Sequence, residues 1–189
     1  GNYNTTTNKS LSNTTDVRWD INDLFRIAGN FNISISEGGG EIYISPDSEV
    51  FKTETDITQK GRLDKSYEKG VDWSGNINAS FNKLTKNNSL ISLVIGGEIR
   101  KNRYEYSTLQ ASGFYDDELN FIGHANGYPT NSNQKPSGSQ DLSTEVGFFA
   151  NGNYMYNNRY YADFVYRLSG SSKFGANQRF GQFWSVGAG

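Results

Sequence analysis

Few residues in this sequence could do chemistry. It contains one histidine, His124, and no cysteine, so a catalytic thiol, a disulfide framework and a thiolate zinc site are excluded. A single imidazole in a segment rich in Gly and Asn is usually just solvated. No acid and base stand at a spacing typical of hydrolases. We therefore expect no enzymatic activity and no bound cofactor.

Two short segments invite a ligand-binding interpretation. The acidic run Asp116, Asp117 and Glu118 concentrates the hard oxygen ligands that Ca²⁺ prefers. No EF-hand spacing accompanies it, so a solvated acidic turn is the better interpretation and no metal site is predicted. Residues 38–40 are three consecutive glycines without the helix and lysine of a phosphate-binding loop, and they are interpreted as a flexible loop crest.

Charge and hydropathy limit the class of protein. The chain has 189 residues, with 18 Lys and Arg against 20 Asp and Glu. This balance provides no basic patch, so nucleic acid is not an expected partner. No uninterrupted apolar run exceeds three residues, which excludes a transmembrane helix. It does not exclude a β-barrel, whose strands present only alternate residues to lipid.

A period of two organises most of the chain. Alternate residues are apolar or Gly while most of their neighbours are polar, and successive side chains of a strand point to opposite faces. Each such segment is therefore predicted to be a strand with one apolar face. The segments are 24–36, 71–83, 91–99, 146–156 and 160–168, with shorter candidates at 16–22 and 180–189.

The predicted connections alternate in length. Tight turns are expected at 22–23, 85–88 and 157–158, and long loops near 37–65, 105–141 and 170–179. Short turns at one end and long loops at the other are typical of an outer-membrane barrel. Trp and Tyr near the strand ends suit the lipid headgroup zone. The predicted fold class is all-β, with about seven antiparallel up-and-down strands.

The C-terminal region contains a recognisable motif. Residues 167–175 are Arg-Leu-Ser-Gly-Ser-Ser-Lys-Phe-Gly, and residues 179–189 are Arg-Phe-Gly-Gln-Phe-Trp-Ser-Val-Gly-Ala-Gly. This stretch resembles a signature of the SusC/RagA family of TonB-dependent outer-membrane transporters, roughly Arg-x-Asp-Gly-Ser-Ser-Arg-Phe-Gly and then Arg-x-Gly-x-Phe-Pro-Ser-x-Ser-x-Gly-Trp. The sequence departs from the signature at Ser169, Lys173, Trp184 and Gly187. Upstream of residue 151 the resemblance is looser.

The resemblance implies that residues 1–189 form part of a transmembrane β-barrel of about 22 strands. Such transporters also carry a TonB box and a plug domain, and neither is recognisable in this sequence. Seven strands cannot close such a barrel, and lipid does not tolerate open sheet edges. The chain is therefore expected to be an internal segment of a longer protein, with residues 1–15 in a polar extracellular loop.

The same resemblance implies import of large nutrients, oligosaccharides or peptides, across the bacterial outer membrane. The implied partners are the rest of the barrel and its plug, TonB acting through the plug, membrane lipid and a SusD-like surface lipoprotein. Loop 105–141 is the predicted substrate or partner contact, because exposed rings and carboxylates suit sugars. The candidate residues are Tyr104, Tyr106, Phe114, Tyr115, Asp116, Asp117, Phe121 and Tyr128, and Arg100 and Arg167 are expected to face the lumen.

Other interpretations stay open. The loop rings could pack the loop against itself, and the lumen arginines could simply pair with acidic residues on neighbouring strands. The alternative function is a secreted all-β module that binds glycan through loop aromatics. It is disfavoured because the long strands have one consistently apolar face and no second apolar set to pack beneath it.

Overall fold

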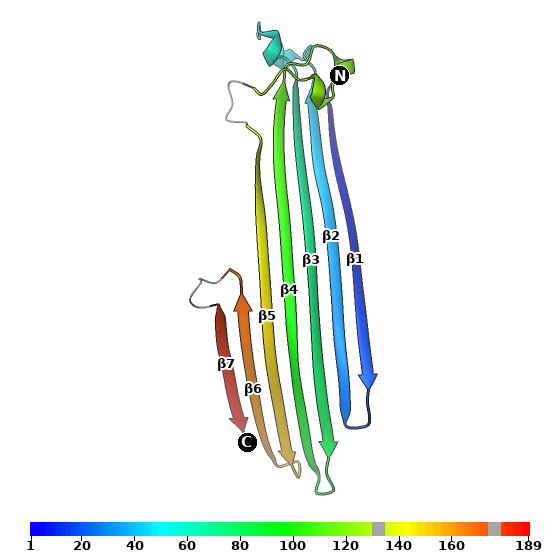
Figure 1. Cartoon of the computed structure of the whole chain (residues 1–189), viewed down its shortest axis with the longest axis vertical. Helices are drawn as coiled ribbons and strands as arrows, with labels where there is room; N and C mark the ends of the chain where they lie inside the picture. Colours follow the sequence, from blue (N-terminus) through cyan, green and yellow to red (C-terminus); the bar gives the residue numbers. More distant parts are fainter. Residues whose placement is uncertain (130–134, 174–178) are drawn as a thin grey trace. The chain divides into compact units, whose positions relative to one another are not determined.

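The computed structural model describes residues 1–129, 135–173 and 179–189, and within them the chain forms seven strands in one sheet (Figure 1). Neighbours in the sheet are also neighbours in the sequence, so the topology is up-and-down, and the predicted all-β fold class is confirmed. The strands are β1 (Tyr3–Asp20), β2 (Phe25–Ile44), β3 (Arg62–Leu84), β4 (Ser89–Ser112), β5 (Ser137–Tyr156), β6 (Tyr160–Ser171) and β7 (Phe180–Ala188).

The predicted tight turns join these strands. In the turn between β5 and β6, Asn157 and Asn158 both have positive φ, and the Arg159 N–H donates to the Tyr156 carbonyl over 3.0 Å. This is the hairpin turn whose twist matches that of its strands, and Asn tolerates the left-handed conformation it requires. Asn88 likewise has positive φ in the turn between β3 and β4.

The strands extend further toward the long loops than the alternation predicted. Strands β2, β3 and β4 have 20, 23 and 24 residues, so the first two long loops shrink to 45–61 and 113–136. The prediction of a loop at residues 1–15 was wrong, because β1 begins at Tyr3. Its polar residues bond to β2, as where the Thr14 hydroxyl donates to the Asn32 side chain over 2.9 Å.

The interpretation of residues 38–40 as a loop crest was also wrong, because all three lie within β2 and Gly38 is buried. A Cβ atom at Gly38 would lie 2.6 Å from the Glu68 Oε1 atom and 2.9 Å from the Asn8 Oδ1 atom. The side chains of the two flanking strands thus occupy the space above this glycine. Close cross-strand packing, rather than loop flexibility, accounts for the glycine at this position.

Each face of the sheet can be followed from strand to strand by the register. Phe148 of β5 pairs with Leu168 of β6, which pairs with Gln182 of β7, and cross-strand partners point to the same face. We call "odd face" the face of the odd-numbered residues of β1–β4 and the even-numbered residues of β5–β7, and "even face" the opposite one. In every predicted strand segment the odd face carries most of the apolar residues, with exceptions such as Val94 and Phe149 on the even face.

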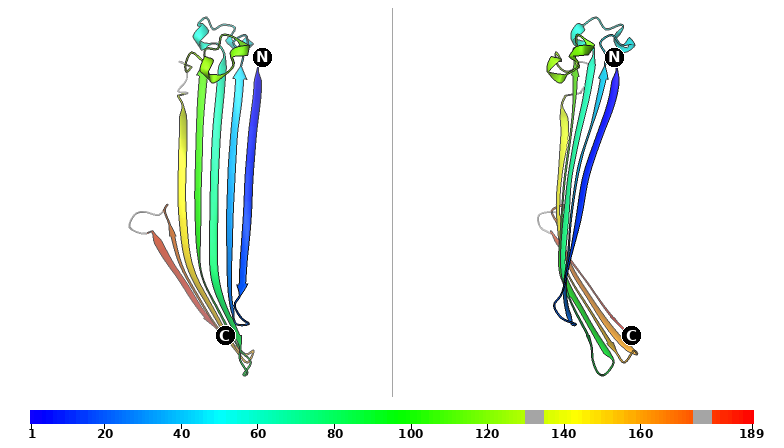
Figure 2. Two further views of the ribbon diagram at one scale, coloured as in Figure 1. Left: turned by 45° about the vertical axis from the view of Figure 1, so that its right-hand side comes forward. Right: turned by 90° about the vertical axis from the view of Figure 1, so that its right-hand side faces the viewer.

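The chain divides into two compact units. The loop unit comprises residues 1–11, 35–71 and 104–141, and the turn unit comprises residues 12–34, 72–103 and 142–189. The loop unit also holds four short 3-10 helices, in the connections β2–β3 and β4–β5 (Figure 2). In the described part of the chain no helix is long and apolar enough to cross a membrane.

Candidate binding surfaces of the loops and of the even face

A small aromatic core holds the two long loops of the loop unit together. Phe114 lies edge-on to Tyr43, with ring centroids 5.4 Å apart, and Tyr43 stacks on Tyr3 at 5.5 Å. Leu63 and Ala111 complete the cluster of buried side chains. The Gly113 and Phe114 N–H groups both donate to the Lys60 carbonyl over 3.0 Å, and Gly113 needs its positive φ to do so. Loop 113–136 is therefore bound to loop 45–61.

This packing buries one of the predicted loop rings and leaves the others exposed. Phe114 has no exposed surface, so the prediction that its ring is available to a ligand was wrong, because the ring fills the core beneath the loops. Tyr115 and Phe121 are 58% and 63% exposed, and Tyr128 is also exposed. The alternative that loop rings pack the loop against itself is thus correct for Phe114. The other three rings remain available for contact.

The loop core lies on the odd face. Tyr43, Leu63 and Ala111 are odd-numbered residues of β2, β3 and β4, and Phe114 packs on them. The start of loop 113–136 thus packs on the odd face of the loop unit. By contrast, Tyr104 and Tyr106 belong to the even face of β4, where the Tyr104 hydroxyl donates to the Glu68 Oε2 atom over 3.0 Å. This hydrogen bond raises the pKa of Tyr104.

The acidic run forms the start of a 3-10 helix. Asp116 is the N-cap of η3 (Asp117–Leu119), and its carboxylate accepts from the Glu118 N–H over 3.0 Å. The Gly1 nitrogen lies 2.5 Å from the Asp117 Oδ2 atom. No group of three or more His, Asp or Glu in residues 1–129, 135–173 and 179–189 is placed to hold a metal ion. Nearby His124 is exposed in η4 (Ile122–His124).

The C-terminal motif contributes a polar cluster to the even face of the turn unit. Arg167, Ser169 and Ser171 alternate along β6, and the Arg167 Nε donates to the Ser169 Oγ over 2.9 Å. Arg167 also forms an ion pair with Glu98 of β4, although β5 lies between the two strands. Gly147 of β5 makes this possible, since a Cβ there would lie 2.9 Å from the Glu98 Oε1 atom. The ion pair therefore passes over a glycine.

A hollow of about 570 Å³ surrounds this ion pair. It combines hydroxyl, amide and charged groups of both signs, and it includes both predicted lumen residues. Arg167 pairs with an acidic residue, as the alternative interpretation proposed, and Arg100 is exposed. The polar residues that line the hollow are Ser74, Asn76, Glu98, Arg100, Glu145, Arg167, Ser169, Ser171 and Lys173.

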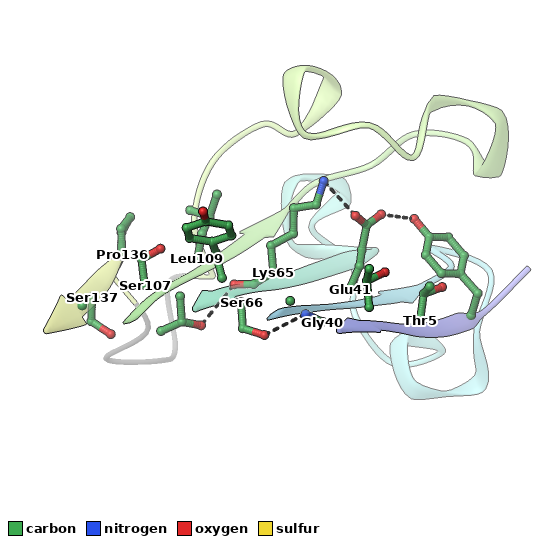
Figure 3. Close-up of a pocket in the computed structure, with 15 residues that line it drawn as sticks. Thr5, Gly40, Glu41, Lys65, Ser66, Ser107, Leu109, Pro136 and Ser137 are labelled. Atoms are coloured by element: carbon green, nitrogen blue, oxygen red, sulfur yellow. Dashed lines mark hydrogen bonds and ion pairs between the residues drawn. The ribbon is translucent and has the colours of Figure 1, made fainter. Parts of the chain in front are cut away.

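A larger hollow of about 1080 Å³ lies on the odd face of the loop unit, and the sequence did not predict it (Figure 3). At one side the Tyr3 hydroxyl donates to the Glu41 Oε1 atom over 2.5 Å, and the Lys65 ammonium lies 2.8 Å from Glu41 Oε2. Burial alone would raise the pKa of Glu41, but the hydrogen bonds from Lys65 and Tyr3 outweigh it and lower that pKa. Burial and the Glu41 carboxylate raise the pKa of Tyr3 to about 12.

Comparison with known proteins finds the fold of this sheet in solved structures of transporters and receptors. No family model matches the sequence. No curated protein matches it either. Among solved structures, by contrast, matches cover nearly the whole chain, and those described below are TonB-dependent transporters and receptors built around a β-barrel. The described sheet has the fold of a strip of such a barrel wall.

Within that class, the RagAB peptide importer in its "open-open" state matches with a TM-score of 0.73 and 20% identity, over 97% of this chain and 20% of that chain. A second structure of the RagAB peptide transporter gives a TM-score of 0.75 at 18% identity over the same shares. BauA, the ferric preacinetobactin receptor from Acinetobacter baumannii, gives 0.54 at 9% identity, over 98% of this chain and 28% of that chain.

These matches confirm in the fold the resemblance to SusC/RagA transporters that the C-terminal motif indicated. The chain spans about a fifth of the length of the RagAB chains that it matches. These neighbours are transporters and a receptor, not enzymes.

Proposed function

We propose that residues 1–189 form seven consecutive strands in the wall of a TonB-dependent transporter in the bacterial outer membrane. In this arrangement the apolar segments 25–35, 71–83, 91–99, 146–156 and 160–168 cross the membrane with the odd face toward lipid. The even face lines the lumen, beside the plug and the rest of the barrel. The long loops then lie outside the cell and the tight turns in the periplasm.

One observation carries this proposal: the apolar side chains of the turn unit have nothing to cover them. Trp184 and Val186 are 72% and 66% exposed, and Phe148 and Ile95 are also exposed. All four belong to the odd face, and the described residues form a single sheet. A contiguous exposed apolar face marks an interaction surface. On long strands with a polar opposite face, lipid is the covering medium that fits.

The cargo and the partners follow from the resemblance. Peptide is the favoured cargo, since the RagAB structures that this chain resembles are of a peptide importer, and oligosaccharide is the alternative. Charged groups of both signs around Glu98 and Arg167 suit the termini and side chains of a peptide. Arg100 and Arg167 would then line the transport path. A SusD-like lipoprotein would cap the barrel, and TonB would act through the plug.

Cysteine labelling of the full-length protein in membrane vesicles tests this arrangement. The chain contributes no cysteine of its own, and Ala150 and Asn151 are adjacent residues of β5 that belong to opposite faces. A fluorophore on Ala150→Cys is expected to be quenched by a lipid-soluble quencher, and one on Asn151→Cys is not. Equal quenching at both positions would contradict the proposal.

The same preparation separates the proposal from the secreted glycan-binding module. A barrel wall requires detergent or lipid to stay in solution, whereas a secreted module is monodisperse without detergent. Uptake of a labelled peptide and of a labelled oligosaccharide by cells then identifies the cargo. Arg167→Gln is expected to raise KM for the true cargo while leaving barrel assembly unchanged.

A further inference from the structure

The 1080 Å³ hollow lies on the odd face of the loop unit, whereas the proposed transport path is lined by even-face residues. Its side chains are odd-numbered residues of β1–β4, including Thr5, Glu41, Lys65 and Leu109 (Figure 3). Along β2 the same set of odd-numbered residues includes Phe25 to Ile35, which form the apolar segment. In the proposed barrel the odd face is the outer face of the wall, so a ligand in this hollow would not be in the lumen.

Glycines create the space. Gly39 of β2 and Gly138 of β5 carry no side chain, and Tyr67 and Ser107 belong to the strands between them. A Cβ at Gly39 would lie 2.9 Å from the Ser66 carbonyl oxygen, and one at Gly138 would lie 2.6 Å from that of Tyr106. The backbone of the adjacent strand thus leaves no room for a side chain at either position. The hollow is a built feature of the sheet rather than a gap in packing.

The lining is mainly apolar surface with a few polar groups, and it has no net charge. Glu41 and Lys65 are its only charged side chains, and they neutralise each other in the ion pair that Tyr3 also joins. The Lys65 ammonium further lies 5.8 Å from the centre of the Phe121 ring. These contacts fix the positions of a carboxylate, an ammonium and a phenol at the side of the hollow. A charged ligand would gain little here, because each charge already has its partner.

The remaining lining consists of hydroxyl groups and apolar surface. Thr5, Thr7 and Ser107 offer side-chain hydroxyls, which both donate and accept hydrogen bonds. The half-exposed Tyr67 ring supplies a flat apolar surface with a polar end. Leu109 and Pro136 extend the apolar part. The ligand that matches such a surface is neutral and rich in hydroxyl groups, and it has an apolar face that can lie against a ring.

We propose that this hollow is a saccharide-binding site on the outer side of the barrel wall. A sugar ring would stack on Tyr67, and its hydroxyls would bond to Glu41, Lys65 and the Thr and Ser hydroxyls. The volume is near the upper end of the range of about 300–1,000 Å³ that is usual for small-molecule sites, enough for several sugar rings. The sidedness of the site depends on the proposed barrel arrangement, but its chemistry does not.

Two sources could supply the sugar: the glycan of an outer-leaflet glycolipid beside the barrel, or a free oligosaccharide. The test uses the full-length protein in detergent and saturation-transfer NMR. The probes are maltopentaose, mannopentaose and the delipidated core oligosaccharide released from the cells' own lipopolysaccharide. Saturation of the core oligosaccharide alone would identify the glycolipid as the source. Saturation of the neutral pentasaccharides would identify free glycan.

Variants assign the signal to this hollow. Tyr67→Ala is expected to weaken binding about tenfold, since the lost ring contact combines apolar area with stacking geometry. Tyr67→Phe keeps the ring and is expected to retain most of the affinity. If the alanine variant does not fold, the affinity of Tyr67→Phe is compared with that of the unaltered protein instead. Tyr115→Ala is the matched control, because it removes an exposed ring of the same unit that does not line the hollow.

The proposal is overturned if no probe shows saturation transfer, or if Tyr67→Ala binds as the unaltered protein does. The second result would place the sugar elsewhere, for instance in the lumen. Failure here is distinct from failure of the transporter proposal. If the label at Ala150→Cys is quenched, the label at Asn151→Cys is not, and no saccharide binds, then the saccharide site is refuted and the barrel-wall proposal stands.

Discussion

The loop unit and the turn unit bury their apolar side chains in different ways. In the loop unit Tyr43, Leu63, Ala111 and Phe114 form a core with at most 3% of any residue exposed. In the part of the turn unit that the structure describes, no hydrophobic side chain is buried, and rings such as Trp184 are largely exposed. The first pattern is that of a water-soluble protein. The second is the pattern that the proposed contact with lipid would require.

This difference shows that the sheet consists of two types of structure along the same strands. In the loop unit, Gly113 and Phe114 bond to loop 45–61, and Phe114 packs on the odd face. In the turn unit the tight turns between β1 and β2, β3 and β4, and β5 and β6 are too short to fold back over the odd face, which the proposed barrel exposes to lipid. Loop length therefore decides which part of the odd face is left for lipid.

Replacement of the central ring is expected to have the largest effect on the loop unit. Phe114→Ala should lower its free energy of unfolding by about 3–5 kcal/mol, the usual cost of removing a fully buried phenyl ring. Hydrogen exchange of the Gly113 and Phe114 amides, which bond to the Lys60 carbonyl, measures the change. Tyr115→Ala should change it by less than about 0.5 kcal/mol, because that ring is exposed. Equal effects of the two variants would mean that the core does not hold the loops.

A charge on the odd face should have the next largest effect, and only in the turn unit. Ile95→Lys in the full-length protein places an ammonium at the centre of the 91–99 segment and should cost about 2–4 kcal/mol against lipid. Val94→Lys, one residue away on the even face, should be tolerated. Yield of assembled barrel in the outer membrane measures both. If Val94→Lys lowers the yield as much as Ile95→Lys, lipid does not cover the odd face.

The loop unit should lose stability at both ends of the pH scale. Burial and Glu41 raise the pKa of Tyr3 to about 12, so its contribution is complete below pH 10, the ordinary value for tyrosine, and is lost as pH rises through 12. The pKa of Glu41 is lowered, so its contribution is present above pH 4.5 and is lost as pH falls through the lowered value. Hydrogen exchange of loop-unit amides against pH measures both limits. Tyr3→Phe should reduce the alkaline loss, to which Tyr43 also contributes because burial raises its pKa to about 12. Glu41→Gln should reduce the acid loss, to which Asp56 also contributes because hydrogen bonds from Thr58 lower its pKa.

The smallest effect is expected for the ion pair over Gly147. Both side chains are partly exposed, so the coupling energy between Glu98 and Arg167 should be about 0.2–1 kcal/mol. A double-mutant cycle with Glu98→Gln and Arg167→Met measures it. Gly147→Ala should abolish the coupling, because the added methyl group occupies the position of the Glu98 side chain. A coupling of several kcal/mol would indicate that this cluster is shielded from water and unlike the rest of the even face.

The sequence predicted the strands of the turn unit well and the loop unit poorly. In segments such as 71–83 the alternation is clear because one face meets an apolar medium and the other a polar one. In the upper part of β3, residues 62–70 carry polar and charged side chains on both faces, so no alternation marks the strand. Those residues pair because β2 and β4 continue beside them, for example through the Lys69–Glu37 ion pair at 3.0 Å. Such pairing cannot be inferred from local pattern.

The candidate site shows the same limit. Tyr115, Phe121 and Tyr128 are exposed as predicted, and Phe114 is not, although all four are rings in one loop. The core at Phe114 requires Tyr43 and Leu63, which belong to other strands far away in the sequence. The alternation of segment 91–99 and the loop predicted over 105–141 gave no sign of this contact. The 1080 Å³ hollow of the loop unit was not predicted for the same reason, because residues of five strands line it.

By itself the sequence determined the two faces of each strand, the turns at residues such as Asn157 and Asn158, and the absence of cysteine chemistry. These properties depend on side-chain type and on backbone preferences of neighbouring residues, which are local. Only the tertiary structure decided which rings are buried, that Arg167 meets Glu98 across Gly147, and where the hollow lies. Those contacts depend on the register between strands, which brings together residues distant in the sequence.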